Sequence, residues 1–195
     1  MNKSSTAYID ASNLKFGVAQ SGWNLDYKSF RSWLRDKFGV SRAVLFMGLI
    51  PNNFEIYNYL QSIGYDISFK PTITSKEGRT KGNVDGELIL TISKDFYENN
   101  LESVVLVAGD GDYHCIVEFL KEKNISITIV SPNRKYLSLL LKRTNVPIII
   151  LDQFIEKLRQ KWKGPRICLN ISGVLFLFMR SLYHNPNTNV KQENK

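Results

Sequence analysis

The feature that most constrains the fold is a series of short apolar segments separated by stretches with helical spacing. Four of them have apolar residues on both faces: VLFM at 44–47, VVLV at 104–107, ITIV at 127–130 and IIIL at 148–151. Strands buried on both faces, in alternation with helices, are typical of a mostly parallel sheet covered by helices on each side. The sequence therefore predicts an α/β sandwich of three layers.

The order of elements follows from the same patterns. We expect strands at 7–10, 42–48, 65–70, 103–107, 125–130 and 146–151. Helices are expected at 27–38, 53–63, 84–99, 113–123, 136–142 and 152–162, the last capped by Asp152. Residues 11–14 are expected to form a loop, 17–22 an irregular segment, and 71–82 a polar basic loop.

Length and composition limit the class of protein. A chain of 195 residues suits one domain, which we place at 1–162, followed by an appendage at 163–195 that is apolar at first and then polar and disordered. The apolar part, 167–179, is too short to span a bilayer. Two cysteines without metal-ligand spacing, and an N-terminus without an apolar signal core, predict a cytoplasmic protein without a zinc site.

The chain is basic, with a formal net charge of +8 and a pI near 9.4. A strongly basic protein favours a polyanionic partner such as nucleic acid. The basic loop contributes Arg79 and Lys81, which are candidate phosphate-binding residues.

Acidic side chains fall where a parallel sheet places its ligands, near the carboxyl ends of strands. Asp10 ends the first predicted strand, Asp110 and Asp112 follow the fourth, and Asp85 opens the helix before it. Carboxylates that converge repel one another unless a cation or a shared proton joins them. Hard divalent cations prefer oxygen ligands, so the pattern predicts a site for one or two Mg²⁺ or Mn²⁺ ions, with Asn13 placed to orient a water or contact phosphate.

Each of these residues also has a structural interpretation. Asp112 can cap the helix that follows it, and Asp10 can close a turn at the end of its strand. Asp85 suits the first turn of a helix, where a negative charge is favourable. The metal hypothesis depends on the residues occurring together.

Three short motifs carry a family resemblance: DxxNL at 10–14, KGNVD at 81–85 and GDGDY at 109–113. In order and spacing they resemble the motifs of the NYN domain, a PIN-like nuclease group that includes the LabA-like proteins. The resemblance covers roughly residues 7–158. It implies a PIN-like Rossmannoid fold and a metal-dependent endoribonuclease whose acidic cluster is Asp10, Asp85, Asp110 and Asp112. The family often has serine where this chain has Ala108, and the lost hydroxyl would weaken a hydrogen bond near the site.

Two functions from different classes follow. The first is a metal-dependent endoribonuclease, with single-stranded RNA as the favoured substrate. The preference for RNA over DNA and the formation of a homo-oligomer are left open. The second is a non-catalytic RNA- or protein-binding regulatory module on the same fold. A nucleotide-binding Rossmann enzyme is disfavoured because the chain has neither GxGxxG nor a P-loop.

Overall fold

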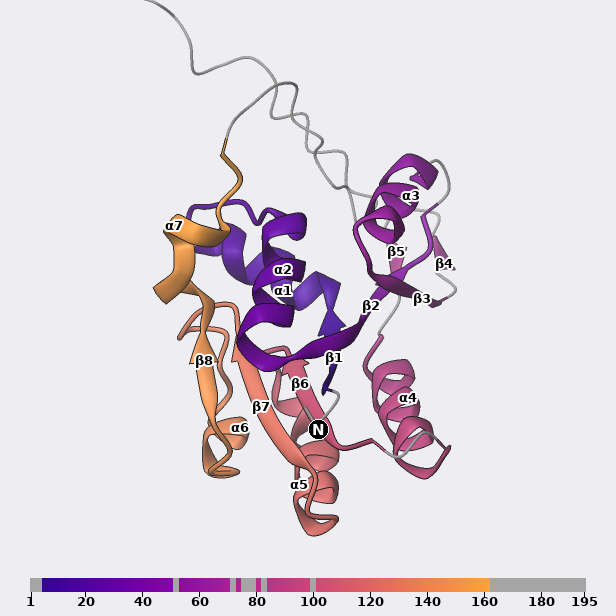
Figure 1. Ribbon diagram of the computed structural model, residues 1–195, viewed down its shortest axis with the longest axis vertical. Coiled ribbons are helices and arrows are strands. Elements are labelled where there is room, and N and C mark those ends of the chain that lie inside the picture. The colour runs from indigo at the N-terminus through magenta and orange to yellow at the C-terminus, as the bar shows by residue number, and fades with distance from the viewer. Residues whose placement is uncertain are drawn as a thin grey trace, which may run out of the picture.

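A six-stranded sheet forms the centre of the protein in the computed structural model, which describes residues 5–50, 53–70, 73–74, 80–81, 84–98 and 101–161. Its order is β3-β2-β1-β6-β7-β8, and all five strand pairs are parallel (Figure 1). The strands are β1 (Ser5–Asp10), β2 (Val40–Gly48), β3 (Asp66–Lys70), β6 (Ser103–Val107), β7 (Ser126–Ser131) and β8 (Ile148–Ile150). The α/β prediction is confirmed, and this sheet is parallel throughout.

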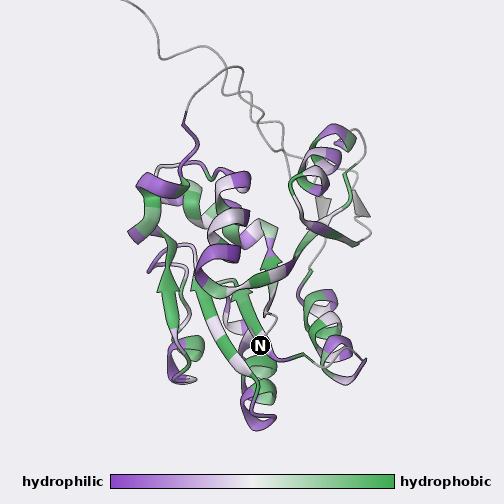
Figure 2. Ribbon diagram, viewed as in Figure 1, coloured by the Kyte–Doolittle hydropathy of each residue, from purple (hydrophilic) through white to green (hydrophobic). Residues whose placement is uncertain are grey.

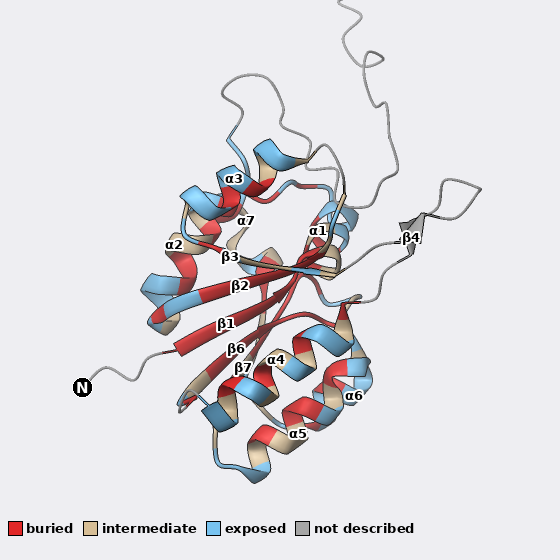
Figure 3. Cartoon of the chain, turned by 90° about the vertical axis from the view of Figure 1, so that its right-hand side faces the viewer, coloured by how far each residue is buried: buried red, intermediate tan, exposed pale blue. Residues whose placement is uncertain are grey.

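Helices cover both faces of the sheet, which confirms the three layers (Figures 1 and 3). One layer holds α1 (Ala11–Gln20), α2 (Tyr27–Phe38), α3 (Phe54–Ser62) and α7 (Ile155–Leu158). The other holds α4 (Asp85–Glu98), α5 (His114–Glu122) and α6 (Leu139–Arg143).

The apolar core is divided by the sheet into two clusters. Side chains alternate along a strand, so Ala7 and Ile9 of β1 pack on one side while Tyr8 packs on the other. Every residue of β1 is buried, as its position in the middle of the sheet requires. The strands are correspondingly apolar, and polar residues gather on the outer faces of the helices (Figure 2).

The expected loop at 11–14 and the irregular segment at 17–22 are wrong over most of their length. Residues 11–20 form α1, which begins where the Asp10 carboxylate accepts a hydrogen bond from Asn13 N. Leu14 and Val18, one turn apart, are buried in the core. The cap and the buried face stabilise a helix whose composition alone is unfavourable.

Three further expectations need correction. The backbone of the basic loop contains two short antiparallel strands, β4 (Ile73–Thr74) and β5 (Thr80–Lys81). The helix expected at 136–142 begins only at Leu139, where Ser138 caps it. Asp152 does not cap a helix to 162, because its carboxylate accepts hydrogen bonds from Ser21 and Trp23, and residues 151–158 form a 3-10 turn and the short α7.

The predicted appendage, 163–195, lies outside the described residues. Within the described part of the chain, no helix combines the length and the apolar character needed to cross a membrane.

The order of the strands sets where a ligand can bind. From β1 the chain proceeds outward to β2 and β3, and then returns to β6 on the other side of β1. The crevice at the carboxyl ends of β1 and β6 is therefore the point where strand order reverses, the usual ligand site of open α/β sheets.

Candidate active site

Asp10 lies at the carboxyl end of β1, and only 6% of its surface is exposed. Its Oδ1 accepts a hydrogen bond from Asn13 N at 2.9 Å, and the Oδ1 of Asn13 accepts one from Gly109 N at 2.9 Å. Asn13 thus ties the end of β1 to the first residue of the acidic turn after β6. Its amide oxygen is committed to this structural bond.

Tyr113 joins two of the predicted carboxylates. Its hydroxyl lies 2.9 Å from Asp10 Oδ2 and 2.6 Å from Asp85 Oδ1, so the two carboxylate oxygens are no farther apart than the sum of these distances. Asp85 begins α4, and Tyr113 ends the 3-10 turn at 111–113. Residues from three separate segments therefore meet at the switch point of the sheet.

The electrostatics of this group follow from burial and like charge. Burial raises the pKa of Asp10, the Asp85 charge raises it further, and the hydrogen bonds from Asn13 and Tyr113 act in the opposite direction. The pKa of Tyr113 is raised by its burial and by both carboxylates, so its hydroxyl stays protonated. That hydroxyl has one proton, which cannot be donated fully to two acceptors at once.

Asp110 and Asp112 lie beside this group on an exposed turn. Asp110 Oδ1 accepts a hydrogen bond from Asp112 N at 3.1 Å, which makes Asp110 the cap of the 3-10 turn. The turn lines an open cavity of about 630 Å³ with Asn13, Lys135 and Tyr136. The cap is therefore Asp110, whereas the structural alternative assigned a capping role to Asp112.

The structure thus unites Asp10 and Asp85 at one hydroxyl and places Asp110 and Asp112 on the adjoining turn. Among the described residues, no three His, Cys, Asp or Glu side chains are grouped so as to hold a metal ion. Asp10 and Asp85 together offer two carboxylates, the number with which proteins commonly bind Mg²⁺ when water and phosphate complete its shell. Asp10 accepts hydrogen bonds from Asn13, Tyr113 and the backbone of Ser12. Because a carboxylate has about four lone-pair positions, these bonds leave room for a cation.

The two predicted phosphate-binding residues, Arg79 and the side chain of Lys81, lie outside the described residues. Sequence reasoning missed two features of the site. The first is Tyr113, the last residue of the GDGDY motif, whose ring is fully buried while its hydroxyl faces the carboxylates. The second is the segment after β7, which brings Lys135 to the acidic turn although Lys135 lies 23 positions after Asp112 in the sequence.

Fold and site together define a parallel α/β protein of the Rossmann-like kind, with paired carboxylates at its switch point. Residues 6–151 match the model of the NYN domain, so the chain belongs to the NYN domain family, which generally has a nuclease-like PIN-type fold. It is similar to the Low amplitude and bright protein LabA of Synechococcus elongatus, with 24% identity over 77% of this chain and 86% of the relative. A solved structure of a Vibrio parahaemolyticus protein of unknown function has the same fold, with a TM-score of 0.67 and 21% identity over 80% of this chain and 96% of the other.

Proposed function

We propose that this protein is a divalent-metal-dependent endoribonuclease that hydrolyses phosphodiester bonds of single-stranded RNA. One observation carries the proposal: Asp10 and Asp85, 75 positions apart in the sequence, converge on the Tyr113 hydroxyl at the switch point of the sheet. Two buried or half-buried carboxylates that meet at one hydroxyl favour a cation, which would lie between them and an incoming phosphate. Membership of the NYN family and the basic charge of the chain support the same function.

Each residue then has a distinct part. Asp10 and Asp85 hold Mg²⁺ or Mn²⁺, and Asp110 and Asp112 bind at the open rim, directly or through water. A bound divalent cation supplies two effects: it lowers the pKa of a water and it stabilises charge on the phosphate. Tyr113 fixes the orientation of the two inner carboxylates by hydrogen bonding, and Asn13 holds the acidic turn against β1.

The test is cleavage of single-stranded RNA by the purified chain with Mn²⁺. Asp110→Asn should reduce the rate by more than about 100-fold, because even residues that only support a metal ligand are worth 10- to 100-fold. The control is Asp36→Asn, which removes the same charge at an exposed position near the C-terminal end of α2 and should cleave normally. Thermal melts of both variants check folding. Equal activity in Asp110→Asn would remove the assignment of the acidic turn.

A second candidate is a non-catalytic RNA- or protein-binding module. Two observations favour it: the described residues contain no group of three metal-binding side chains, and Ala108, where the family often has serine, is buried among apolar residues. Calorimetric titration with Mn²⁺ discriminates between the two functions. Heat of binding that disappears in Asp85→Asn supports the nuclease, and absence of heat in the natural chain supports the module.

A further inference from the structure

The segment that connects β7 to α6, residues 132–138, is fixed to the candidate active site; we call it the β7–α6 loop. The Asn133 side chain, only 3% exposed, donates to Gly17 O of α1 at 2.7 Å. At its other end, Ser138 N donates to Gly109 O at 2.8 Å, so the loop bonds directly to the acidic turn. Both anchors are backbone or buried contacts, which hold a loop more firmly than exposed side chains do.

Three glycines allow this loop to lie close to its neighbours. A Cβ added to any of them would fall within 3.0 Å of a loop atom, at 2.3 Å for Gly17 and Pro132 Cβ, 2.4 Å for Gly109 and Tyr136 O, and 2.6 Å for Gly111 and Ser138 Oγ. Two of these glycines belong to the GDGDY motif. The motif therefore serves the loop as well as the carboxylates.

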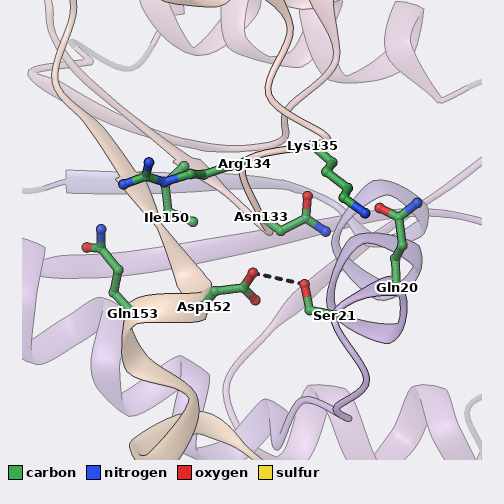
Figure 4. A pocket seen from close by; sticks show the side chains of 8 residues that line it. All are labelled: Gln20, Ser21, Asn133, Arg134, Lys135, Ile150, Asp152 and Gln153. Atoms are coloured by element: carbon green, nitrogen blue, oxygen red, sulfur yellow. Dashed lines mark hydrogen bonds between the residues drawn. The ribbon is translucent and has the colours of Figure 1, made fainter.

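Two cationic side chains, Arg134 and Lys135, lie at the exposed tip of the β7–α6 loop. Within the described part of the chain, neither forms a salt bridge with an acidic side chain. Lys135 and Gln20 line the cavity at the acidic turn and also a second cavity of about 410 Å³, which Arg134 lines as well. The two cavities therefore adjoin, because Gln20 and Lys135 line both of them. In Figure 4 the Lys135 side chain extends toward Gln20, whereas the Arg134 side chain lies nearer Ile150.

The one carboxylate in the second cavity is Asp152, counting only described lining residues. One of its oxygens accepts a hydrogen bond from Ser21 Oγ at 2.9 Å (Figure 4). The other accepts one from Trp23 Nε1 at 3.0 Å. Both donors follow α1 and offset the negative charge of Asp152. Arg134 and Lys135 project from the β7–α6 loop. The loop side of this cavity is thus cationic.

We propose that Arg134 and Lys135 bind successive phosphates of single-stranded RNA and lead the strand from the acidic turn into the cavity between α1 and β8. This inference rests on the proposed function, since it names the path of that substrate. A phosphodiester chain matches the charges of this surface. One phosphate would bind the divalent cation of the proposed site, and the next phosphates would bind the side chains of Arg134 and Lys135. The anchors at Asn133 and Ser138 fix the backbone of the loop before binding, which reduces the entropy lost when the strand is ordered.

The test measures binding without cleavage. A labelled single-stranded RNA of about 12 nucleotides, within the usual site size for such proteins, is titrated in EDTA at several KCl concentrations and followed by fluorescence anisotropy. Replacing both residues, as Arg134→Gln with Lys135→Gln, should weaken binding about tenfold and reduce the slope of log K against log salt by about 1.4, or 0.7 for each lost phosphate contact.

The matched control is Lys94→Gln with Lys123→Gln, which removes the same charge. Both lysines are exposed and lie near the C-terminal ends of α4 and α5, at the opposite edge of the sheet. This control should change affinity less than about twofold, because screening limits the reach of surface charge. Equal weakening in the two double variants, or no RNA binding by the natural chain, would overturn the inference.

Cleavage of the same RNA with Mn²⁺ separates this inference from the proposed function. If RNA binds at Arg134 and Lys135 but is not cut, the proposed nuclease activity is contradicted, while the proposed RNA path still stands. If the loop variant and the natural chain cut RNA equally well, the proposed RNA path is contradicted, while the proposed nuclease activity still stands.

Discussion

Asp10, Asp85 and Tyr113 form an arrangement that favours function over stability. Two carboxylates share one hydroxyl proton, and one of them is almost fully buried. Folding must therefore bring like charges together and remove one of them from water, which is unfavourable in the absence of a cation. Such local instability is common at sites that await a ligand.

Asp10→Asn should make the metal-free protein more stable at pH 7, by about 1 kcal/mol, the usual contribution of one hydrogen bond. The new amide can donate to the Tyr113 oxygen, so that the hydroxyl proton is left for Asp85. Asparagine also caps a helix as well as aspartate does, so α1 keeps its first hydrogen bond. Urea unfolding in EDTA measures the effect, and a loss of stability at pH 7 would contradict it.

The gain should depend on pH. Burial raises the pKa of Asp10 above its ordinary 3.8, so between the two values the native chain holds a proton that the unfolded chain has released. Stability of the natural chain therefore falls as pH rises through this interval. The advantage of Asp10→Asn should be full above the raised pKa and vanish below 3.8. Asp26→Asn, at the cap of α2, is the control and should show no such gain.

At the scale of single residues, the sequence predicts which acidic residues belong to the candidate site but not which hydrogen bonds hold their side chains. Asp10 and Asp85 could be named because each stands at an element boundary within a motif. Tyr113 could not, because an aromatic residue after a turn is usually part of the core, and its ring is indeed buried. Only the tertiary structure shows that its hydroxyl reaches two carboxylates from distant segments.

Among the elements, α1 and the β7–α6 loop depend on each other. Gly17 is unfavourable inside a helix, yet its missing side chain is what lets Pro132 approach. The loop in turn presents its backbone to the acidic turn. Contact between two elements, and not helix propensity, explains this glycine.

Gly17→Ala should therefore destabilise the protein by about 1 to 3 kcal/mol, although alanine is the better helix former. Its Cβ would lie 2.3 Å from Pro132 Cβ, and Pro132 is a rigid neighbour. Gly86→Ala, in α4, is the matched control, because nothing lies within 4 Å of its added Cβ. That variant should be more stable by about 0.5 to 1 kcal/mol. Thermal melts in which the stability of both variants changes in the same direction would refute the argument.

Sequence patterns predicted the strands well and α1 poorly, for a physical reason. Strands with apolar residues on both faces have one environment in an α/β protein, between two layers of helices. The segment at 11–20 contains Ser12, Asn13 and Gly17, which all lower helix propensity. Its helix is stabilised by the Asp10 cap and by burial of Leu14 and Val18, and burial depends on the rest of the fold.

For the whole molecule, strand order determines which residues can act together. The alternation of elements predicts a parallel sheet, but it does not say that β6 lies beside β1. That adjacency joins the end of β1, the start of α4 and the acidic turn into one site. It also places the β7–α6 loop, which no motif marks, over the same edge.

A cation bound at this site should stabilise the entire fold, because it would join carboxylates from β1 and α4 that the unfolded chain holds apart. At 100 times its dissociation constant, a ligand specific for the native state adds about 2.7 kcal/mol, which for a domain of this size raises the Tm by about 5 to 10 °C. Thermal unfolding with increasing Mn²⁺ should show this rise for the natural chain. Asp85→Asn, which keeps the oxygen that accepts from Tyr113, should show almost none. An equal rise in both proteins would place the cation elsewhere, and a constant Tm would favour the non-catalytic module.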